Sequence, residues 1–209
     1  MNLNISKTII LASQSPRRMA LLKQMGIDCL VMPADIDETV LSFEPPSAYV
    51  LRLAEQKALA IVAKINGQYA DLPILAADTT VALDGEIFGK PENEADAFNM
   101  LKKLSNSTHQ VHTAIALAFK GKYETALNTT LVTMMPLSDA MINAYIATNE
   151  PIDKAGSYAI QGLAGNWIKR IEGSYTGVMG LPVHETTMLL EKICGKIWRY
   201  KTIGTRNFN

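Results

Sequence analysis

The chain has 209 residues, of which 48% are hydrophobic and 19% are charged, and its twenty basic and twenty acidic side chains give a formal net charge of zero. This composition is typical of a globular protein, and the charge balance argues against a dedicated nucleic-acid binder or a protein of anionic membranes. Cys29 and Cys194 lack the spacing of a metal site or a disulfide scaffold, and no secretion signal or membrane span is evident, so we expect a cytoplasmic protein.

In chain order, the sequence predicts strands and helices with turn or capping residues between them. The predicted elements are a strand at 9–12, a helix at 16–25, a strand at 29–32, a helix from 46 to about 65, strands at 73–83 and 86–88, a helix at 94–104, strands at 110–119 and 123–135, a helix from 139 to about 148, a strand at 167–171 and a helix at 182–194. Because helices lie before and after a β-hairpin, this order indicates an α/β fold around a mixed sheet. We expect residues 1–196 to form one domain of two closely joined lobes and residues 197–209 to form a C-terminal tail.

The segment between the first strand and the first helix combines several groups that bind anions. Ser15 suits the N-cap of the helix, and Pro16 suits its first position. The free N–H groups and the positive end of the helix dipole then face a loop that adds the hydroxyl groups of Ser13 and Ser15 and the guanidinium groups of Arg17 and Arg18. This combination predicts a phosphate-binding site, although a capped helix with solvent-exposed arginines explains the segment equally well when it is taken alone.

Three charged side chains lie at positions that are unusual for structural residues. Asp78 is in the middle of a predicted strand, where a buried carboxylate is costly unless it is paired or bound to a metal. Lys57 lies on the apolar stripe of the long helix, a position that snorkelling at the edge of a core also explains. Lys90 follows the predicted hairpin and stands between Gly89 and Pro91, which hold it rigidly. These residues are therefore candidates for a catalytic site.

An acidic loop follows the second predicted strand and contains Asp35, Asp37 and Glu38. Mg²⁺ takes one or two carboxylates and completes its shell with water and substrate phosphates, so this loop is a candidate cation site, although acidic loops are common. His109 and His112 do not form a metal pair, because residues three apart on a strand point to opposite faces. Neither a P-loop nor a G-x-G-x-x-G motif is present. Together these features indicate chemistry on a triphosphate without a P-loop.

Six motifs in a fixed order match a known family. They are Ser13-Gln14-Ser15-Pro16-Arg17-Arg18, Arg52-Leu53-Ala54 with Lys57-Ala58, Ala77-Asp78-Thr79, Gly89-Lys90-Pro91, Leu104-Ser105 with His109-Gln110-Val111, and Asp153-Lys154-Ala155-Gly156 with Ile160-Gln161-Gly162. On these residues the chain resembles the Maf family of nucleoside triphosphate pyrophosphatases. The resemblance implies an elongated mixed sheet with flanking helices and a central cleft, similar to the inosine triphosphate pyrophosphatases. It also implies a divalent cation (Mg²⁺ or Mn²⁺) as cofactor, a nucleoside triphosphate as substrate, and a homodimer.

Within the family, the sequence at 155–162 and 173–175 is similar to the branch that acts on dTTP and UTP rather than the branch that acts on 7-methyl-GTP. The resemblance implies that Asp78 accepts a proton and that Arg17, Thr79 and Gln161 select the substrate. The remaining matches to family site positions are Ser13, Asp37, Glu38, Lys57 and Lys90. Ala159 and Asn106 depart from the family pattern, because each replaces a common glycine.

The expected roles divide as follows: Asp78, Lys57 and Lys90 are catalytic, Ser13, Ser15, Arg17, Arg18, Thr79 and Gln161 bind substrate, and Asp37, Glu38 and Asp78 hold the metal. Whether Asp78 is the base or a metal ligand stays open at this point. A non-catalytic nucleotide-binding regulator of cell division is the alternative hypothesis.

Overall fold

The computed structural model describes residues 8–195, so the predicted tail at 197–209 lies outside the described residues. Within these residues a seven-stranded sheet has the order β2-β1-β3-β5-β6-β7, with β4 paired to β3. The strands are β1 (Thr8–Leu11), β2 (Asp28–Val31), β3 (Ile74–Leu83), β4 (Glu86–Phe88), β5 (Thr108–Phe119), β6 (Lys122–Met134) and β7 (Ile168–Glu172). The helices are α1 (Pro16–Gln24), α2 (Pro46–Lys64), α3 (Glu94–Leu104), α4 (Asp139–Ile146), α5 (Tyr175–Val178) and α6 (Val183–Cys194).

The α/β fold around a mixed sheet is confirmed, and so are the predicted elements, with ends that differ by a few residues. The additional short helix α5 is capped by Ser174, whose hydroxyl group accepts a hydrogen bond from the N–H of Gly177. Asn106 adopts a positive φ of 54°, a conformation that asparagine tolerates better than most residues, which explains how it replaces a glycine. None of the helices within residues 8–195 is long and apolar enough to cross a membrane.

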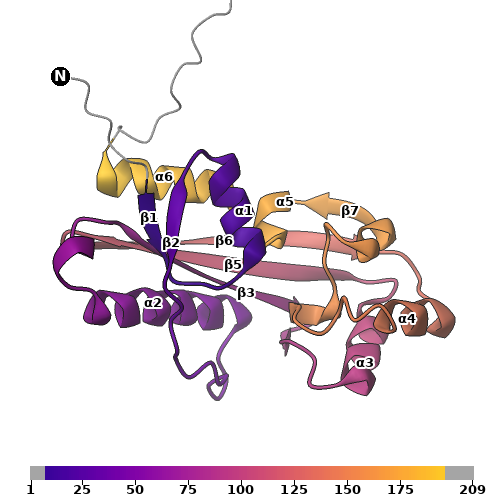
Figure 1. The fold of residues 1–209 in the computed structure, drawn as a ribbon. Helices are drawn as coiled ribbons and strands as arrows, with labels where there is room; N and C mark the ends of the chain where they lie inside the picture. Colours follow the sequence, from indigo (N-terminus) through magenta and orange to yellow (C-terminus); the bar gives the residue numbers. More distant parts are fainter. Residues whose placement is uncertain (1–7, 196–209) are drawn as a thin grey trace, which may run out of the picture.

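Helices cover both faces of the sheet (Figure 1). The helix α2 lies along one face, while α1 and α6 pack on the opposite face. On the α2 face the sheet presents small side chains, which let the helix approach closely; they include Ala76, Ala114 and Ala116. A further hydrophobic cluster forms at the other end of the long strands, where α3 and α4 pack on them. The molecule is therefore elongated along β3, β5 and β6 (Figure 1).

The edge of β3 has an interruption that determines where the site forms. One edge of β3 pairs with β5 along the strand, from Ile74 to Ala82. On its other edge β1 pairs only with Ile74 and Leu75, and β4 pairs only from Val81 to Leu83. Residues 76–80 therefore have no neighbouring strand on that edge within the described structure. This interruption leaves room for a cavity beside the centre of the sheet.

Candidate active site

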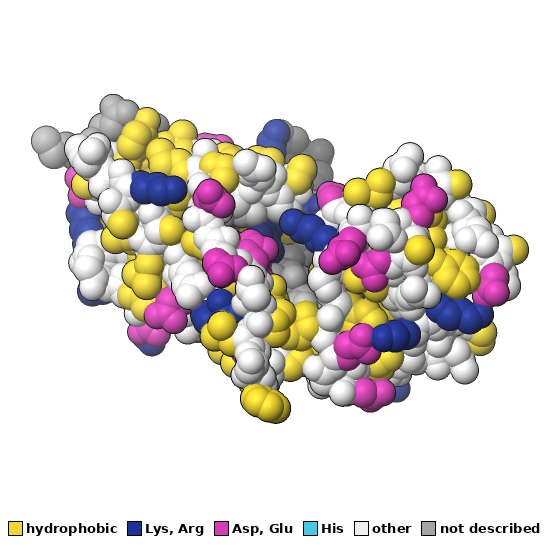
Figure 2. All heavy atoms as spheres, turned by 90° about the horizontal axis from the view of Figure 1, so that it is seen from below, with side chains coloured by type: hydrophobic (Ala, Val, Ile, Leu, Met, Phe, Trp, Pro, Cys, Tyr) yellow, Lys and Arg dark blue, Asp and Glu magenta, His cyan; other side chains and the backbone are white. Residues whose placement is uncertain are grey.

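A cavity of about 810 Å³ opens beside the interrupted edge of β3. Its walls come from the β1–α1 loop, α2, β3, the loop after β4, residues 153–161 and residues 178–180. In the space-filling view of Figure 2, lysine and arginine side chains lie in the hollow between two bulkier parts, and acidic side chains lie at its rim. Every residue predicted for the site lines this cavity except Asp37.

The β1–α1 loop is fixed by Ser13 rather than by the predicted N-cap. Ser15 occupies the N-cap position, but its side chain makes no capping hydrogen bond within the described structure. Ser13 Oγ instead accepts hydrogen bonds from the Ser15 backbone N–H (3.2 Å) and from Arg18 Nη1 (2.9 Å). The N-terminus of α1 thus faces the cavity without a side-chain cap, an arrangement suited to an anionic ligand.

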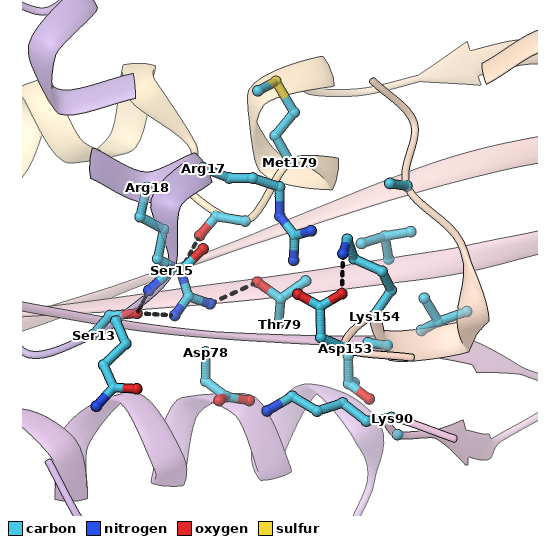
Figure 3. Close-up of a pocket in the computed structure, with 18 of the residues that line it drawn as sticks. Ser13, Ser15, Arg17, Arg18, Asp78, Thr79, Lys90, Asp153, Lys154 and Met179 are labelled. Atoms are coloured by element: carbon cyan, nitrogen blue, oxygen red, sulfur yellow. Dashed lines mark hydrogen bonds and ion pairs between the residues drawn. The ribbon is translucent and has the colours of Figure 1, made fainter. Parts of the chain in front are cut away.

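Arg18 is a partly buried cation that joins three parts of the cavity wall (Figure 3). Its Nε donates to the carbonyl oxygen of Gly180 (2.7 Å), its Nη1 to Ser13, and its Nη2 to Thr79 Oγ1 (3.2 Å). Thr113 Oγ1 lies 3.0 Å from the same Thr79 hydroxyl group and donates to the carbonyl oxygen of Gly177. Because all three nitrogen atoms of its guanidinium group are hydrogen-bonded, Arg18 has a fixed orientation and holds Thr79 in place.

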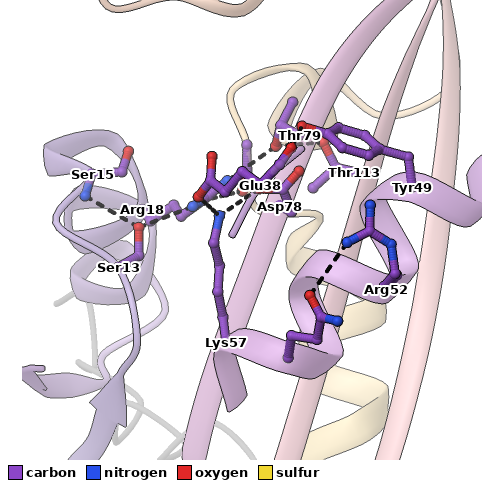
Figure 4. Close-up of polar contacts among 12 residues, drawn as sticks. Ser13, Ser15, Arg18, Glu38, Tyr49, Arg52, Lys57, Asp78, Thr79 and Thr113 are labelled. Carbon is purple, nitrogen blue, oxygen red and sulfur yellow. Dashed lines mark hydrogen bonds and ion pairs between the residues drawn. The ribbon is translucent and has the colours of Figure 1, made fainter. Parts of the chain in front are cut away.

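Asp78 and Lys57 form a buried ion pair on the α2 face of the sheet, opposite the face that carries Thr79 (Figure 4). Lys57 Nζ lies 2.7 Å from Asp78 Oδ1 and 2.6 Å from Glu38 Oε1, so one ammonium group bridges two carboxylates. Asp78 is 7% exposed and Lys57 is 9% exposed. The polar partner explains why a lysine is tolerated on the apolar stripe of α2. Successive side chains of a strand point to opposite faces, so Asp78 faces α2 whereas Thr79 faces α1.

The pKa of the Asp78 carboxyl group lies above its usual value. Burial raises this pKa, the positive charges of Lys57 and Arg18 partly oppose the increase, and the Glu38 carboxylate adds to it. A carboxylate with a raised pKa accepts a proton more readily than an exposed one. Asp78 therefore combines a fixed position with the proton affinity that a general base needs.

Arg17 and Lys90 are cations of the cavity whose side chains form neither an ion pair nor a hydrogen bond within the described structure. Figure 3 shows that they extend from opposite walls, with Arg17 on α1 and Lys90 on the loop after β4. The neighbouring Gly89 carbonyl oxygen accepts a hydrogen bond from the N–H of Gly156 (3.0 Å), which ties this loop to the 153–161 segment. An extended polyphosphate placed between these walls would meet positive charge on both sides.

Sequence reasoning gave no role to Asp153 and Lys154, although it placed them in a motif. Both line the cavity, where they form an ion pair with each other (Figure 3). Burial acts to raise the pKa of Asp153, but the hydrogen bond from Lys154 and the charge of Arg17 lower it overall. The only indication that this pair belongs to the site was its place in one of the six family motifs, because an aspartate and a lysine are not unusual in a polar loop.

Asp37 does not share the cavity with the other predicted metal ligands. Its Oδ1 accepts a hydrogen bond from the Thr39 N–H (2.9 Å), and its side chain lines a smaller pocket beside Arg52. Asp35 lines the main cavity instead, together with Glu38 and Asp78. No group of three or more His, Cys, Asp or Glu side chains converges on a metal position within residues 8–195.

Gln161 lines the cavity on the segment that also carries Tyr158. The Tyr158 hydroxyl group is hydrogen-bonded to Nε2 of the buried His109 (2.7 Å), which fastens this segment to β5. His112 contacts Thr129 on β6 instead, so the two histidines have different partners, as expected for residues on opposite faces.

Comparison with known proteins identifies the relatives of this chain. The family model described as Maf-like protein matches residues 8–193. A dTTP/UTP pyrophosphatase of Methylobacillus flagellatus is 52% identical over 195 residues, which cover 93% of this chain and 96% of that protein. A dTTP/UTP pyrophosphatase of Neisseria meningitidis serogroup B is 46% identical, with 89% of this chain and 94% of that protein covered.

A relative named nucleoside triphosphate pyrophosphatase, from Haemophilus ducreyi, is 47% identical, and the match covers 90% of this chain and 95% of that protein. Among solved structures, the Ham1 protein of Staphylococcus aureus aligns with a TM-score of 0.41 and 21% identity, over 63% of this chain and 72% of that one.

Proposed function

The chain belongs to the Maf family, and we propose that it hydrolyses dTTP and UTP to the nucleoside monophosphate and pyrophosphate, which removes unwanted nucleotides from the cellular pool. One observation carries this proposal: the buried Asp78 carboxylate shares a cavity of about 810 Å³ with Arg17 and Lys90, which extend from opposite walls. The names of the relatives supply the substrate class.

In the proposed reaction, water attacks the α-phosphorus and the bond to the bridging oxygen of the β-phosphate breaks, so that pyrophosphate leaves. Asp78 accepts the proton of the attacking water, and Lys57 holds this carboxylate in position. Arg17, Lys90 and the N-terminus of α1 stabilise the charge on the phosphates. Positioning and charge neutralisation supply most of the acceleration in phosphoryl transfer, so the rigid Arg18 network contributes by fixing the loop.

The proposal includes a divalent cation, Mg²⁺ or Mn²⁺. Glu38, with Asp35 nearby on the cavity wall, carries the carboxylate that would hold it, and Asp78 would be a ligand only in the alternative in which it is not the base. These donors fit a hard cation that keeps water and phosphate oxygens in its shell, since such an ion needs one or two carboxylates rather than a complete protein cage. When bound, the cation would neutralise phosphate charge and polarise the oxygens around the reacting phosphorus.

Base selection is assigned to Gln161, with Arg17 and Thr79. The Gln161 amide can donate and accept hydrogen bonds, which matches the alternating donor and acceptor edge of uracil and thymine. The buried contact between Tyr158 and His109 supports the segment that carries Gln161.

A panel of nucleotides with pyrophosphate detection tests the proposal. The purified protein should release pyrophosphate from dTTP and UTP in the presence of Mg²⁺ or Mn²⁺, and a chelator should abolish the release. Tight binding of dTTP without any pyrophosphate release would instead favour the alternative of a non-catalytic regulator. A preference for 7-methyl-GTP would overturn the assignment to the dTTP and UTP branch.

We also propose that the protein acts in the cytoplasm as a homodimer, without nucleic-acid or membrane partners. The family resemblance supports the dimer. Cys29 and Cys194 lack the spacing of a disulfide scaffold, which supports the compartment, and the zero net charge supports the absence of those partners. Light scattering on the purified protein and fractionation of cells test these points.

A further inference from the structure

The segment between β2 and α2 carries Glu38 to the cavity. This acidic strap, residues 33–45, contains no helix or strand, so its position depends on contacts with the rest of the molecule. Lys57 Nζ contacts the Glu38 carboxylate (2.6 Å), yet the Glu38 side chain is 49% exposed. One salt bridge to a half-exposed side chain fixes a loop only weakly. Other contacts must therefore hold the strap in place.

Arg52 of α2 provides the strongest of these contacts. Its Nε and Nη2 lie 2.6 and 2.7 Å from the two carboxylate oxygens of Glu44, near the end of the strap. This is the two-pronged geometry in which arginine binds carboxylates best. The same Nη2 donates to the carbonyl oxygen of Thr39 (3.0 Å), the residue that follows Glu38. The Glu44 side chain is 8% exposed and that of Arg52 is 20% exposed, so this pair is partly shielded from water.

Tyr49 adds a contact at the backbone of Glu38 itself. The Tyr49 hydroxyl group donates to the Glu38 carbonyl oxygen (3.0 Å), and the Arg52 guanidinium lies 5.6 Å from the centre of the Tyr49 ring (Figure 4). Arg52 and Tyr49 are three residues apart, which places them on the same side of α2. One side of this helix therefore holds the strap at Glu38 and at the residues that follow it.

We propose that Arg52, by binding Glu44 and the Thr39 carbonyl group, is the positioning residue that holds Glu38 against Lys57. Arg52 does not line the main cavity; it lies beside the smaller pocket under the strap, so it acts on the reaction only through Glu38. This inference rests on the proposed function, in which Glu38 serves the cation and the charge balance of Lys57.

A double-mutant cycle tests this dependence. Arg52→Gln should lower kcat about tenfold to a hundredfold, since displacement of a catalytic group by about 1 Å has effects of this size. In a Glu38→Gln background, Arg52→Gln should lower kcat further by less than about twofold, because the group that it positions is already lost. Equal factors in both backgrounds would overturn the proposal, and so would an unchanged kcat for Arg52→Gln.

Amide hydrogen exchange requires no turnover, so it tests the positioning role of Arg52 whether or not the proposed function is correct. Arg52→Gln and Glu44→Gln should both raise amide exchange within residues 37–44, whereas exchange in β3 and β5 stays as in the unchanged protein. Unchanged exchange in residues 37–44 would overturn the proposal even if the enzyme is active. Arg170→Gln is the matched control: Arg170 forms an exposed pair with Glu172 (2.9 Å), so this variant should retain both kcat and strap exchange.

Discussion

Replacement of Asp78 by asparagine separates the chemistry of the cavity from its stability. The substitution keeps the size of the side chain and its ability to accept a hydrogen bond from Lys57, and it removes the negative charge and the proton acceptor. If Asp78 is the general base, kcat for dTTP should fall by about 10²- to 10⁴-fold, which is the usual contribution of such a group. The KM should change much less, because the cations that bind phosphate are untouched.

The effect on stability should be small for reasons visible in the structure. Loss of one partner of a buried ion pair usually costs about 3–5 kcal/mol, because the remaining charge is left alone. Here Lys57 retains Glu38 at 2.6 Å, so its ammonium group is still paired. Burial raises the pKa of Asp78, which means that the ionised carboxylate is less stable in the folded protein than in the unfolded chain. A neutral asparagine removes this penalty, and we expect a change of about 1 kcal/mol or less in the free energy of unfolding.

Steady-state pyrophosphate release and urea unfolding of the same preparation measure the two effects. Asp71→Asn is the matched control, because Asp71 forms an exposed pair with Lys120 and the same chemical change there should alter neither quantity. Near-normal turnover by the folded Asp78→Asn variant would refute the catalytic assignment. If the Asp78→Asn variant fails to fold, the argument that Glu38 alone keeps the Lys57 ammonium group paired is refuted.

Three further predictions concern Lys57, Arg17 and His109. Lys57→Met should reduce both stability and kcat, because Asp78 and Glu38 then repel each other without a shared cation; unfolding and turnover assays check this. Arg17→Gln should raise the KM for dTTP with little change in melting temperature, since Arg17 forms no ion pair within the described structure. Burial lowers the pKa of His109 from 6.5 to about 4, so protons bind the unfolded chain preferentially and stability falls by about 3 kcal/mol between pH 7 and pH 4. In His109→Gln, urea unfolding at the two pH values should lack this contribution.

The elements of the fold could be predicted from local signals. The Asp84-Gly85 turn is flanked by β3 and β4, as the dipeptide predicts, because both residues adopt the positive φ that such a turn requires. The apolar spacing of α2 correctly placed Lys57 on the buried side of the helix. The cost of a buried carboxylate in the middle of a strand predicted that Asp78 is paired or bound to a metal, and it is paired with Lys57. Local sequence thus identified which residues are unusual.

Local sequence could not predict which side chains contact one another in the folded protein. Lys57 and Asp78 are separated by 21 positions and Arg18 and Thr79 by 61, and these contacts exist only because the sheet brings the elements together. The acidic loop illustrates the same limit. The sequence and the family resemblance named both Asp37 and Glu38 as ligands, but the Asp37 carboxylate binds the backbone N–H of Thr39, whereas Glu38 lines the cavity.

The interrupted edge of β3 explains why neighbouring residues can serve one site from opposite faces of a sheet. In a continuous sheet, Asp78 and Thr79 would be separated by the adjacent strand. Here β1 ends beside Leu75 and β4 ends beside Val81, so residues 76–80 have no strand next to them on this edge within the described structure. The Leu75 carbonyl oxygen accepts from the N–H of Ala12 across this edge, and backbone groups alternate along a strand. By this alternation the N–H and C=O groups of residues 77 and 79 point into the same opening, where water or a bound substrate can satisfy them.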